Sequence, residues 1–269
     1  MHSFERLALE SSLRRALERR EFSLHYQATV DLKTGSVTGM EALLRWMHPD
    51  LGMVSPTLFI PLAEETGLIV AIGRWVINAT CAQNKAWQEQ GLPALCVSVN
   101  LSARQFNDDS LLRDVAQALK ESDLAPQWLE LEVTESMVMY NPDKAVRLLS
   151  DLKAMGISIA IDDFGIGYSS LSQLKRFPIN TIKIDRSFIK DLMQNKEDAA
   201  ITGAIIAMGT TLNLNVIAEG VEIDAQIGFL QEHQCNEMQG YYFSKPIPEG
   251  EFAQLLRAKK ALVRENASE

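Results

Sequence analysis

Seven side chains that could bind a metal ion or activate a water molecule stand within or just after short apolar runs of the sequence. They are Glu41, Asn100, Glu132, Asp162, Asp163, Lys183 and Glu219. Most single Asp and Glu residues are solvated surface groups, so residue type alone indicates little. Their shared position at predicted strands is the stronger signal.

A parallel barrel would bring these side chains together, because the carboxyl ends of all its strands open on one face. So many buried carboxylates need compensation, and Lys183 can neutralise only one negative charge. Bound cations are the natural remedy, and oxygen ligands favour Mg²⁺ or Mn²⁺ over Zn²⁺. The adjacent Asp162 and Asp163 predict a carboxylate shared between two ions, an arrangement used for in-line displacement at phosphorus.

Simpler interpretations stay open for each residue taken alone. Asn100 could bond only to loop backbone, the Asp pair could cap a turn, and Lys183 could extend to the rim of an apolar region. Glu130 alternates with Glu132, so both could lie on a solvated strand face. All of these interpretations together would require a coincidence.

Short apolar runs alternate with longer amphipathic ones along most of the chain, which is typical of strands joined by crossover helices. The first two strands are joined by Lys33-Thr34-Gly35-Ser36. This turn is too short for a crossover, so we expect an antiparallel pair. The predicted strands are 22–30, 37–44, 94–100, 128–133, 157–162, 181–184, 215–218 and 238–241.

Several helices have clear start and stop signals. Ser55-Pro56 and Asn141-Pro142 each combine a capping residue with a first-turn proline. Gly156 is expected to end the helix over 144–155. Another helix is expected over 11–20, and the uncharged stretch 199–218 is interpreted as a buried helix followed by a buried strand rather than a membrane span.

The composition fits one large globular domain, since 269 residues is close to the length of a single (β/α)8 barrel. The net charge of −9 argues against binding of polymeric nucleic acid. Three distant cysteines, Cys81, Cys96 and Cys235, indicate no disulfide framework, and no signal peptide is expected, so a cytoplasmic location fits best. We expect a lead-in at 1–20, a barrel at 21–262 and a tail at 263–269.

The sequence resembles the EAL family of cyclic di-GMP phosphodiesterases from about residue 13 to residue 256. The matching segments are Tyr26-Gln27, Glu41-Ala42-Leu43-Leu44-Arg45-Trp46, Val99-Asn100-Leu101-Ser102, Glu132-Val133-Thr134-Glu135-Ser136, Asp162-Asp163-Phe164-Gly165, Lys183-Ile184-Asp185, Ala218-Glu219-Gly220-Val221-Glu222 and Gln239-Gly240-Tyr241. A lone E-A-L tripeptide is weak evidence, but the ordered series is specific. It implies an α/β fold, a (β/α)8 TIM-like barrel with an antiparallel first strand.

The resemblance implies a role for each site residue. One metal ion would be held by Glu41, Asn100, Glu132 and Asp162, and a second by Asp162 and Asp163, with Glu219 nearby. The catalytic group would comprise Lys183, which contacts the attacking water, with Glu41 and Glu219. Gln27, Arg45 and Gln239 would bind the substrate, and Glu135 would stabilise the loop at 164–170. The implied cofactors are two Mg²⁺ or Mn²⁺ ions.

The implied reaction is hydrolysis of cyclic di-GMP to the linear dinucleotide pGpG. A catalytically silent receptor or interaction module is the main alternative, although such a protein is expected to have lost metal ligands. Another magnesium-dependent phosphodiesterase is opposed by the matches at Gln27 and Arg45. The resemblance also implies a homodimer and fusion to sensory or GGDEF-type domains. Two positions depart from the family pattern, Ala28 and Ile166, and the second bears on the loop.

Overall fold

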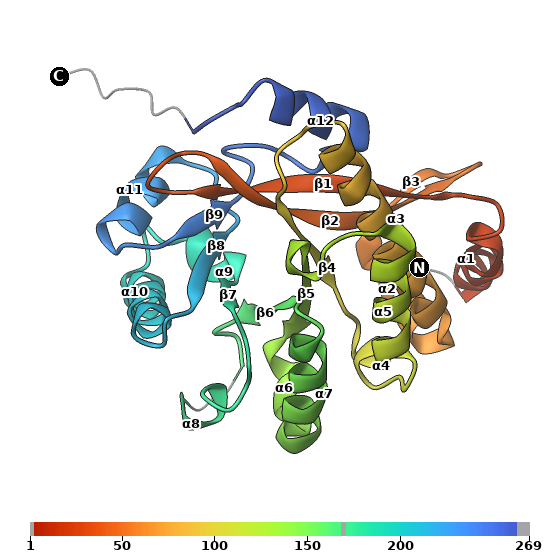
Figure 1. The fold of residues 1–269 in the computed structure, drawn as a ribbon, viewed down its shortest axis with the longest axis horizontal. Helices are drawn as coiled ribbons and strands as arrows, with labels where there is room; N and C mark the ends of the chain where they lie inside the picture. Colours follow the sequence, from red (N-terminus) through yellow and green to blue (C-terminus); the bar gives the residue numbers. More distant parts are fainter. Residues whose placement is uncertain (1–2, 168–170, 263–269) are drawn as a thin grey trace.

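The computed structural model describes residues 3–167 and 171–262, and eight strands close into a barrel with helices around it (Figure 1). The barrel strands follow the order β1, β2, β4, β5, β6, β7, β8 and β9, and β9 pairs again with β1. β1 is antiparallel to both of its barrel neighbours. Every other barrel pair is parallel. The predicted TIM-like barrel with an antiparallel first strand is confirmed.

The barrel strands lie close to the predicted ranges. They span Phe22–Asp31 (β1), Val37–His48 (β2), Cys96–Asn100 (β4), Leu129–Thr134 (β5), Ser158–Phe164 (β6), Thr181–Ile184 (β7), Asn215–Glu219 (β8) and Glu237–Gln239 (β9). The sequence does not predict the short flanking strands β3 (Gly52–Val54) and β10 (Ile247–Pro248), because segments of two or three residues carry no periodicity.

Helices surround the barrel on its outer side (Figure 1). They span Ser3–Ala16 (α1), Pro56–Thr66 (α2), Leu68–Glu89 (α3), Ala103–Phe106 (α4), Leu111–Ser122 (α5), Glu135–Tyr140 (α6), Pro142–Ala154 (α7), Leu171–Leu174 (α8), Arg186–Lys190 (α9), Lys196–Thr211 (α10), Asp224–Glu232 (α11) and Glu249–Arg257 (α12). The stretch 199–218 therefore forms most of α10 and β8, as predicted.

The residues predicted to cap or end helices do so in the structure, with one exception. The side chain of Asn141 accepts a hydrogen bond from the backbone N–H of Lys144, and Gly156 after α7 has a φ of 91°, a conformation that favours glycine. Ser55 occupies the cap position of α2 without capping it, since its hydroxyl bonds to Thr57. The first helix was expected at 11–20, but it begins at Ser3 and ends at Ala16.

The strand side chains that point into the barrel lumen are polar, and those that point outward against the helices are apolar. Glu132 on β5 reaches Lys183 on β7, and because β6 lies between these strands, the contact crosses the barrel interior. Glu130 likewise accepts a hydrogen bond from Thr181. Both glutamates are buried, so the interpretation of a solvated strand face is wrong. The alternating residues Leu129, Leu131 and Val133 are buried too and face the helices.

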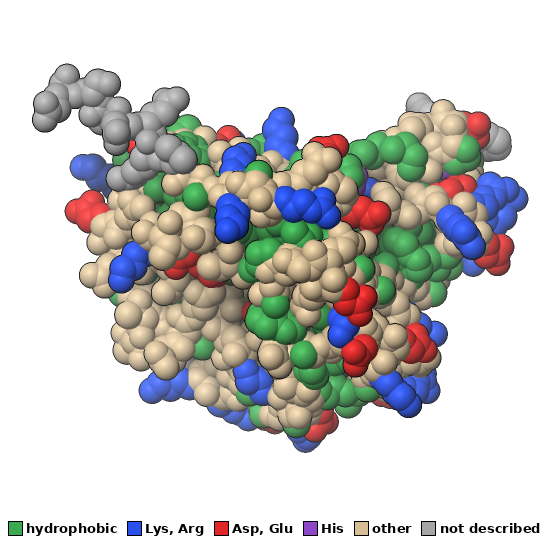
Figure 2. Space-filling model, turned by 45° about the horizontal axis from the view of Figure 1, so that its top comes forward, with side chains coloured by type: hydrophobic (Ala, Val, Ile, Leu, Met, Phe, Trp, Pro, Cys, Tyr) green, Lys and Arg blue, Asp and Glu red, His purple; other side chains and the backbone are tan. Residues whose placement is uncertain are grey.

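The outer surface carries charges of both signs, interspersed on the face shown in Figure 2. Within residues 3–167 and 171–262, no single helix has the length and apolar composition needed to cross a membrane, while α2 and α3 meet these criteria only as a pair bent by 118°.

Candidate active site

Lys183 lies at the centre of four carboxylates inside the barrel. Its Nζ is 2.7 Å from Glu219 Oε1, 2.8 Å from Glu132 Oε2, 3.3 Å from Glu41 Oε2 and 3.9 Å from Asp162 Oδ1. The lysine side chain is 1% exposed. These carboxylates come from β2, β5, β6 and β8, so residues that are distant in sequence meet as the barrel geometry predicts.

Amide side chains orient Glu41 within this cluster. Asn100 Nδ2 donates to Glu41 Oε1 at 2.5 Å, and Gln239 Nε2 donates to Glu41 Oε2 at 2.7 Å. Gln239 Nε2 also lies 3.0 Å from Gln27 Oε1. Strand register brings these groups together, because Gln27 is opposite Glu41, and Asn100 is beside Glu132.

Asp162 and Asp163 lie at the end of β6, where the backbone leaves regular strand geometry. Asp163 has a φ of 53°, its N–H bonds to Asp162 Oδ1 at 2.9 Å, and the β6–β7 register shifts between Ile161 and Phe164. As a result, both side chains project to the same mouth of the barrel. Oxygen atoms of Asp162, Asp163 and Glu219 lie within 4.8 Å of one another.

The electrostatics of the cluster are those of carboxylates with too few counter-charges. Burial raises the pKa of Glu132 well above its usual value and that of Glu219 to about 8. Burial, with the neighbouring aspartate, raises the pKa of Asp163 to about 6. Burial opposes the charge of Lys183, yet the surrounding carboxylates raise its pKa well above normal. Glu41 alone has a lowered pKa, because Lys183 and two amide donors outweigh its burial.

These residues fit a divalent metal centre. The clustered donors of Asp162, Asp163 and Glu219 are all oxygen atoms, the ligand type that Mg²⁺ and Mn²⁺ prefer. The raised pKa values of Glu219 and Asp163 show that the charged carboxylates lack compensation, which a bound cation would supply. Glu132 and Glu41 contact Lys183, Asn100 bonds to Glu41, and these three residues complete an oxygen-rich mouth.

Glu135 lies outside the carboxylate cluster and binds the start of the loop after β6. Its Oε2 accepts hydrogen bonds from the backbone N–H groups of Gly165 at 3.1 Å and Gly167 at 3.3 Å. Replacing Gly167 with a larger residue would force Glu135 or the backbone to move, since an added Cβ would lie 2.6 Å from Glu135 Oε1. Ile166 is exposed. Residues 168–170 of the predicted loop lie outside the described residues.

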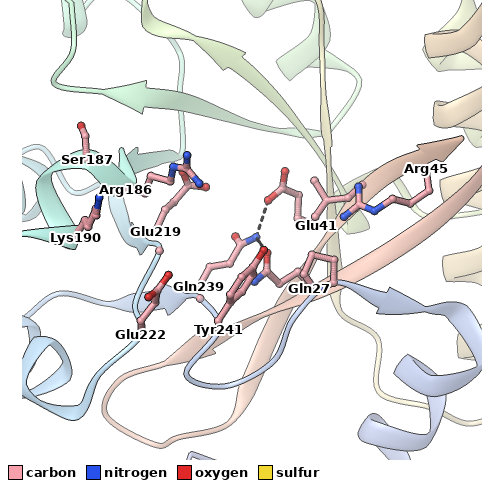
Figure 3. Close-up of a pocket in the computed structure, with 14 residues that line it drawn as sticks. Gln27, Glu41, Arg45, Arg186, Ser187, Lys190, Glu219, Glu222, Gln239 and Tyr241 are labelled. Carbon is pink, nitrogen blue, oxygen red and sulfur yellow. Dashed lines mark hydrogen bonds between the residues drawn. The ribbon is translucent and has the colours of Figure 1, made fainter. Parts of the chain in front are cut away.

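A cavity of about 600 Å³ adjoins the carboxylate cluster at Glu41 and Glu219. Gln27 and Gln239 line its middle and Arg45 its edge, as Figure 3 shows. The Oε1 atom of Gln239 is buried and has no hydrogen-bond partner among the described residues. All three predicted substrate-binding residues therefore face one cavity.

The sequence did not predict the residues that form the cavity wall opposite Arg45. Arg186, Ser187 and Lys190 on the short helix α9 line it, across from Arg45 (Figure 3). Tyr241 and Glu222 line it as well. A usable signal was the position of Arg186 just after β7, because residues following barrel strands face the mouth.

The sequence of the barrel is that of a known family. Residues 10–246 match the family profile described as EAL domain. The chain belongs to the EAL domain family. Over 244 residues this EAL domain is 50% identical to the bifunctional diguanylate cyclase/cyclic di-GMP phosphodiesterase MucR of Pseudomonas aeruginosa, covering 91% of this chain and 36% of that protein. It is 42% identical to the cyclic di-GMP phosphodiesterase PdeR of Escherichia coli, covering 91% and 37%. It thus spans about a third of the length of these relatives.

Solved structures agree with the family assignment. The phosphodiesterase part of MucR in complex with c-di-GMP superposes with a TM-score of 0.89 at 48% identity, covering 91% of this EAL domain and 99% of that chain. The EAL domain of FimX from Pseudomonas aeruginosa bound to c-di-GMP gives a TM-score of 0.82 at 29% identity, covering 89% and 96%.

Proposed function

We propose that this EAL domain hydrolyses one phosphodiester bond of cyclic di-GMP to give linear pGpG, with two Mg²⁺ or Mn²⁺ ions in the active site. The observation that carries the proposal is the cluster of carboxylates around Lys183. This cluster adjoins a cavity that has Arg45 at its edge. Relatives named as cyclic di-GMP phosphodiesterases and a related structure in complex with c-di-GMP support the substrate.

The family resemblance implies how the metal ligands would be divided between the two ions. Glu41, Asn100, Glu132 and Asp162 would hold one ion, and Asp162 and Asp163 the second, with Glu219 nearby directly or through water. Bound divalent ions would lower the pKa of a water molecule and neutralise charge on the phosphoryl oxygens.

The protein groups would orient the reacting partners. Lys183, kept cationic by its neighbouring carboxylates, would donate a hydrogen bond that fixes the attacking water in line with the phosphorus. Glu219 lies 2.7 Å from Lys183 Nζ, so it would hold that ammonium group in place beside the attacking water. Glu41 would keep its charge and, held by Asn100 and Gln239, would fix the first metal position.

The cavity would hold the rest of the substrate. Arg45 would pair with a phosphate, as guanidinium groups do. Gln27 and Gln239, which line the cavity, would bind polar edges of the guanine and ribose. Glu135 would keep the loop after β6 in place, and with it the Asp pair.

The second candidate is a receptor that binds cyclic di-GMP without hydrolysing it. Chromatography of cyclic di-GMP incubated with the protein and Mg²⁺, with and without a chelator, separates the two. We expect a linear product that disappears on chelation. Intact dinucleotide in the presence of tight calorimetric binding would establish the receptor instead. Homodimerisation, fusion to sensory or GGDEF-type domains and a cytoplasmic location stay predictions from the family resemblance.

A further inference from the structure

One buried glutamine joins two separate segments that line the cavity. Gln226 lies in the first turn of α11 and is 3% exposed. Its Oε1 accepts from the backbone N–H groups of Glu222 at 2.8 Å and Ile223 at 3.1 Å, in the loop after β8. Its Nε2 donates to the carbonyl of Ile189 in α9 at 2.7 Å.

The oxygen and the nitrogen of the Gln226 side-chain amide have different structural roles. An oxygen that accepts from backbone N–H groups at a helix start satisfies donors that the helix leaves free, which is an ordinary local role. The Nε2 donor forms no bond within α11. It reaches a carbonyl on another element, 37 residues away in sequence, and so fixes the distance between α9 and the loop after β8.

Helix α9 needs such an anchor. It has five residues, and helices of that length are not stable on their own. Asp185 caps it at Ser187 N, and the buried side chain of Ile189 holds its inner face. The Gln226 bond is the contact that ties its last turn to a neighbour at backbone level.

Both tethered segments form the cavity wall opposite Arg45. Arg186, Ser187 and Lys190 come from α9, while Glu219 ends β8 and Gly220 and Glu222 lie in the loop after it. The segments touch closely, since a Cβ on Gly220 would lie 2.7 Å from the Cβ of Arg186. A small displacement of α9 would therefore move the guanidinium of Arg186 and the ammonium of Lys190 relative to Arg45 (Figure 3).

We infer that Gln226 is a positioning residue, whose amide holds α9 so that Arg186 and Lys190 contact the substrate from the cavity wall opposite Arg45. This inference rests on the proposed function, because a cyclic dinucleotide has a second phosphate that must lie away from the reacting one. The second phosphate carries a negative charge, and the two cations of α9 offer it charge-assisted hydrogen bonds.

The test compares Gln226→Met with Gln231→Met. Gln231 lies on the same helix and makes the same kind of bond, from Nε2 to the carbonyl of Leu32 at 2.6 Å, but Leu32 follows β1 and does not line the cavity. Both variants lose an amide-to-carbonyl bond. Gln226→Met also loses the two bonds that Oε1 accepts, so we expect it to lose more thermal stability than Gln231→Met. KM for cyclic di-GMP should rise about tenfold in Gln226→Met alone, with kcat nearly unchanged.

A second measurement is independent of substrate. Hydrogen exchange of the backbone amides over 186–192 in the ligand-free protein should accelerate in Gln226→Met and not in Gln231→Met. In a background that carries both Arg186→Gln and Lys190→Gln, Gln226→Met should raise KM no further, because it acts through those two side chains. Should Gln226→Met not fold, Gln226→Glu keeps an oxygen acceptor at the start of α11 and replaces the donor to Ile189 with a carboxylate oxygen that repels that carbonyl, so the same changes in KM and exchange are expected.

The outcomes separate the two proposals. A wild-type protein that neither hydrolyses nor binds cyclic di-GMP would refute the proposed function, while exchange over 186–192 would still decide whether Gln226 holds α9. Unchanged exchange, or equal KM values in the two methionine variants of an active enzyme, would overturn the positioning role.

Discussion

Glu135 on α6 and Gly165 after β6 are joined by a hydrogen bond from the glycine N–H to the carboxylate at 3.1 Å. The same carboxylate oxygen accepts from Gly167, so the backbone just beyond Asp162 and Asp163 is tied to the neighbouring strand end. A residue that is not a proposed metal ligand can thereby govern the geometry of two that are.

Replacing Glu135 with alanine should lower kcat about 100-fold, because misplacement of reacting groups by about 1 Å has an effect of that order. Glu135→Gln keeps an oxygen acceptor and should retain much more activity. Steady-state kinetics with Mg²⁺ over a range of concentrations measure both. An alanine variant with wild-type kcat and wild-type metal dependence would exclude a role for the loop contact.

Asp163→Asn should abolish most hydrolysis while leaving the fold intact. Asparagine tolerates the left-handed backbone that Asp163 adopts at φ 53°, so the substitution removes a charge without straining the turn. We expect kcat to fall at least about 100-fold, with cyclic di-GMP binding through Arg45 retained. The matched control is Asp151→Asn, which removes one charge at an exposed position on α7. Equal rates for the two variants would remove the second metal position.

Ca²⁺ should bind to the domain and support little or no hydrolysis. It accepts longer bonds and looser coordination than Mg²⁺, so the carboxylates could hold it without fixing the water in line. Product formation in saturating Ca²⁺ and saturating Mg²⁺ should differ by at least an order of magnitude, while calorimetry records binding of both. Equal turnover with the two ions would contradict the geometric argument.

The metal-free protein should lose stability as the pH rises from about 4.5 to about 8. Burial raises the pKa of Glu219 from 4.5 to about 8, so in this window the folded protein holds a proton that the unfolded chain has released, and stability falls with pH. Metal binding must expel such protons. Saturating Mg²⁺ should therefore stabilise the protein most at the upper end of the window.

Thermal denaturation in a chelator at several pH values measures this effect. The lowered pKa of His25 acts in the opposite direction, since its proton is bound more tightly by the unfolded chain. Glu219→Gln is therefore the required comparison, and its melting temperature should fall less steeply with pH than that of the wild type. Parallel slopes in the two proteins would show that Glu219 is not the group responsible.

Much of the barrel and its carboxylate-rich mouth could be predicted, because both depend on local signals. The β1–β2 turn is too short for a crossover, and strand ends carry the chemistry, so Glu41, Glu132 and Asp162 could be grouped without coordinates. The face of β5 could not be assigned in this way. Glu130 and Glu132 alternate as a solvated face would, and only the contacts with Thr181 and Lys183 across the interior identify a polar barrel lumen.

The wall formed by α9 was missed for a different reason. A helix of five residues has no periodicity to detect, and its attachment to the molecule is made by Gln226, 37 positions beyond Ile189. Hydrogen bonds from side chains to distant backbone carbonyls leave no local pattern in a sequence. The start of α1 eluded prediction as well, because helix ends are the least certain part of any periodic segment.

The pairing of β1 with both β2 and β9 makes the first strand the seam along which the barrel closes. The β1–β2 hairpin is local and can form early, whereas the β1–β9 pairing joins residues about as far apart in sequence as Gln27 and Gln239, which are separated by 212 positions. Contacts of such long range are slow to form because their loop entropy must be overcome first. Since Gln27 and Gln239 bond to each other across this seam beside Glu41, the cavity is closed by a long-range strand pairing, and a nascent chain should acquire activity only after β9 has been synthesised.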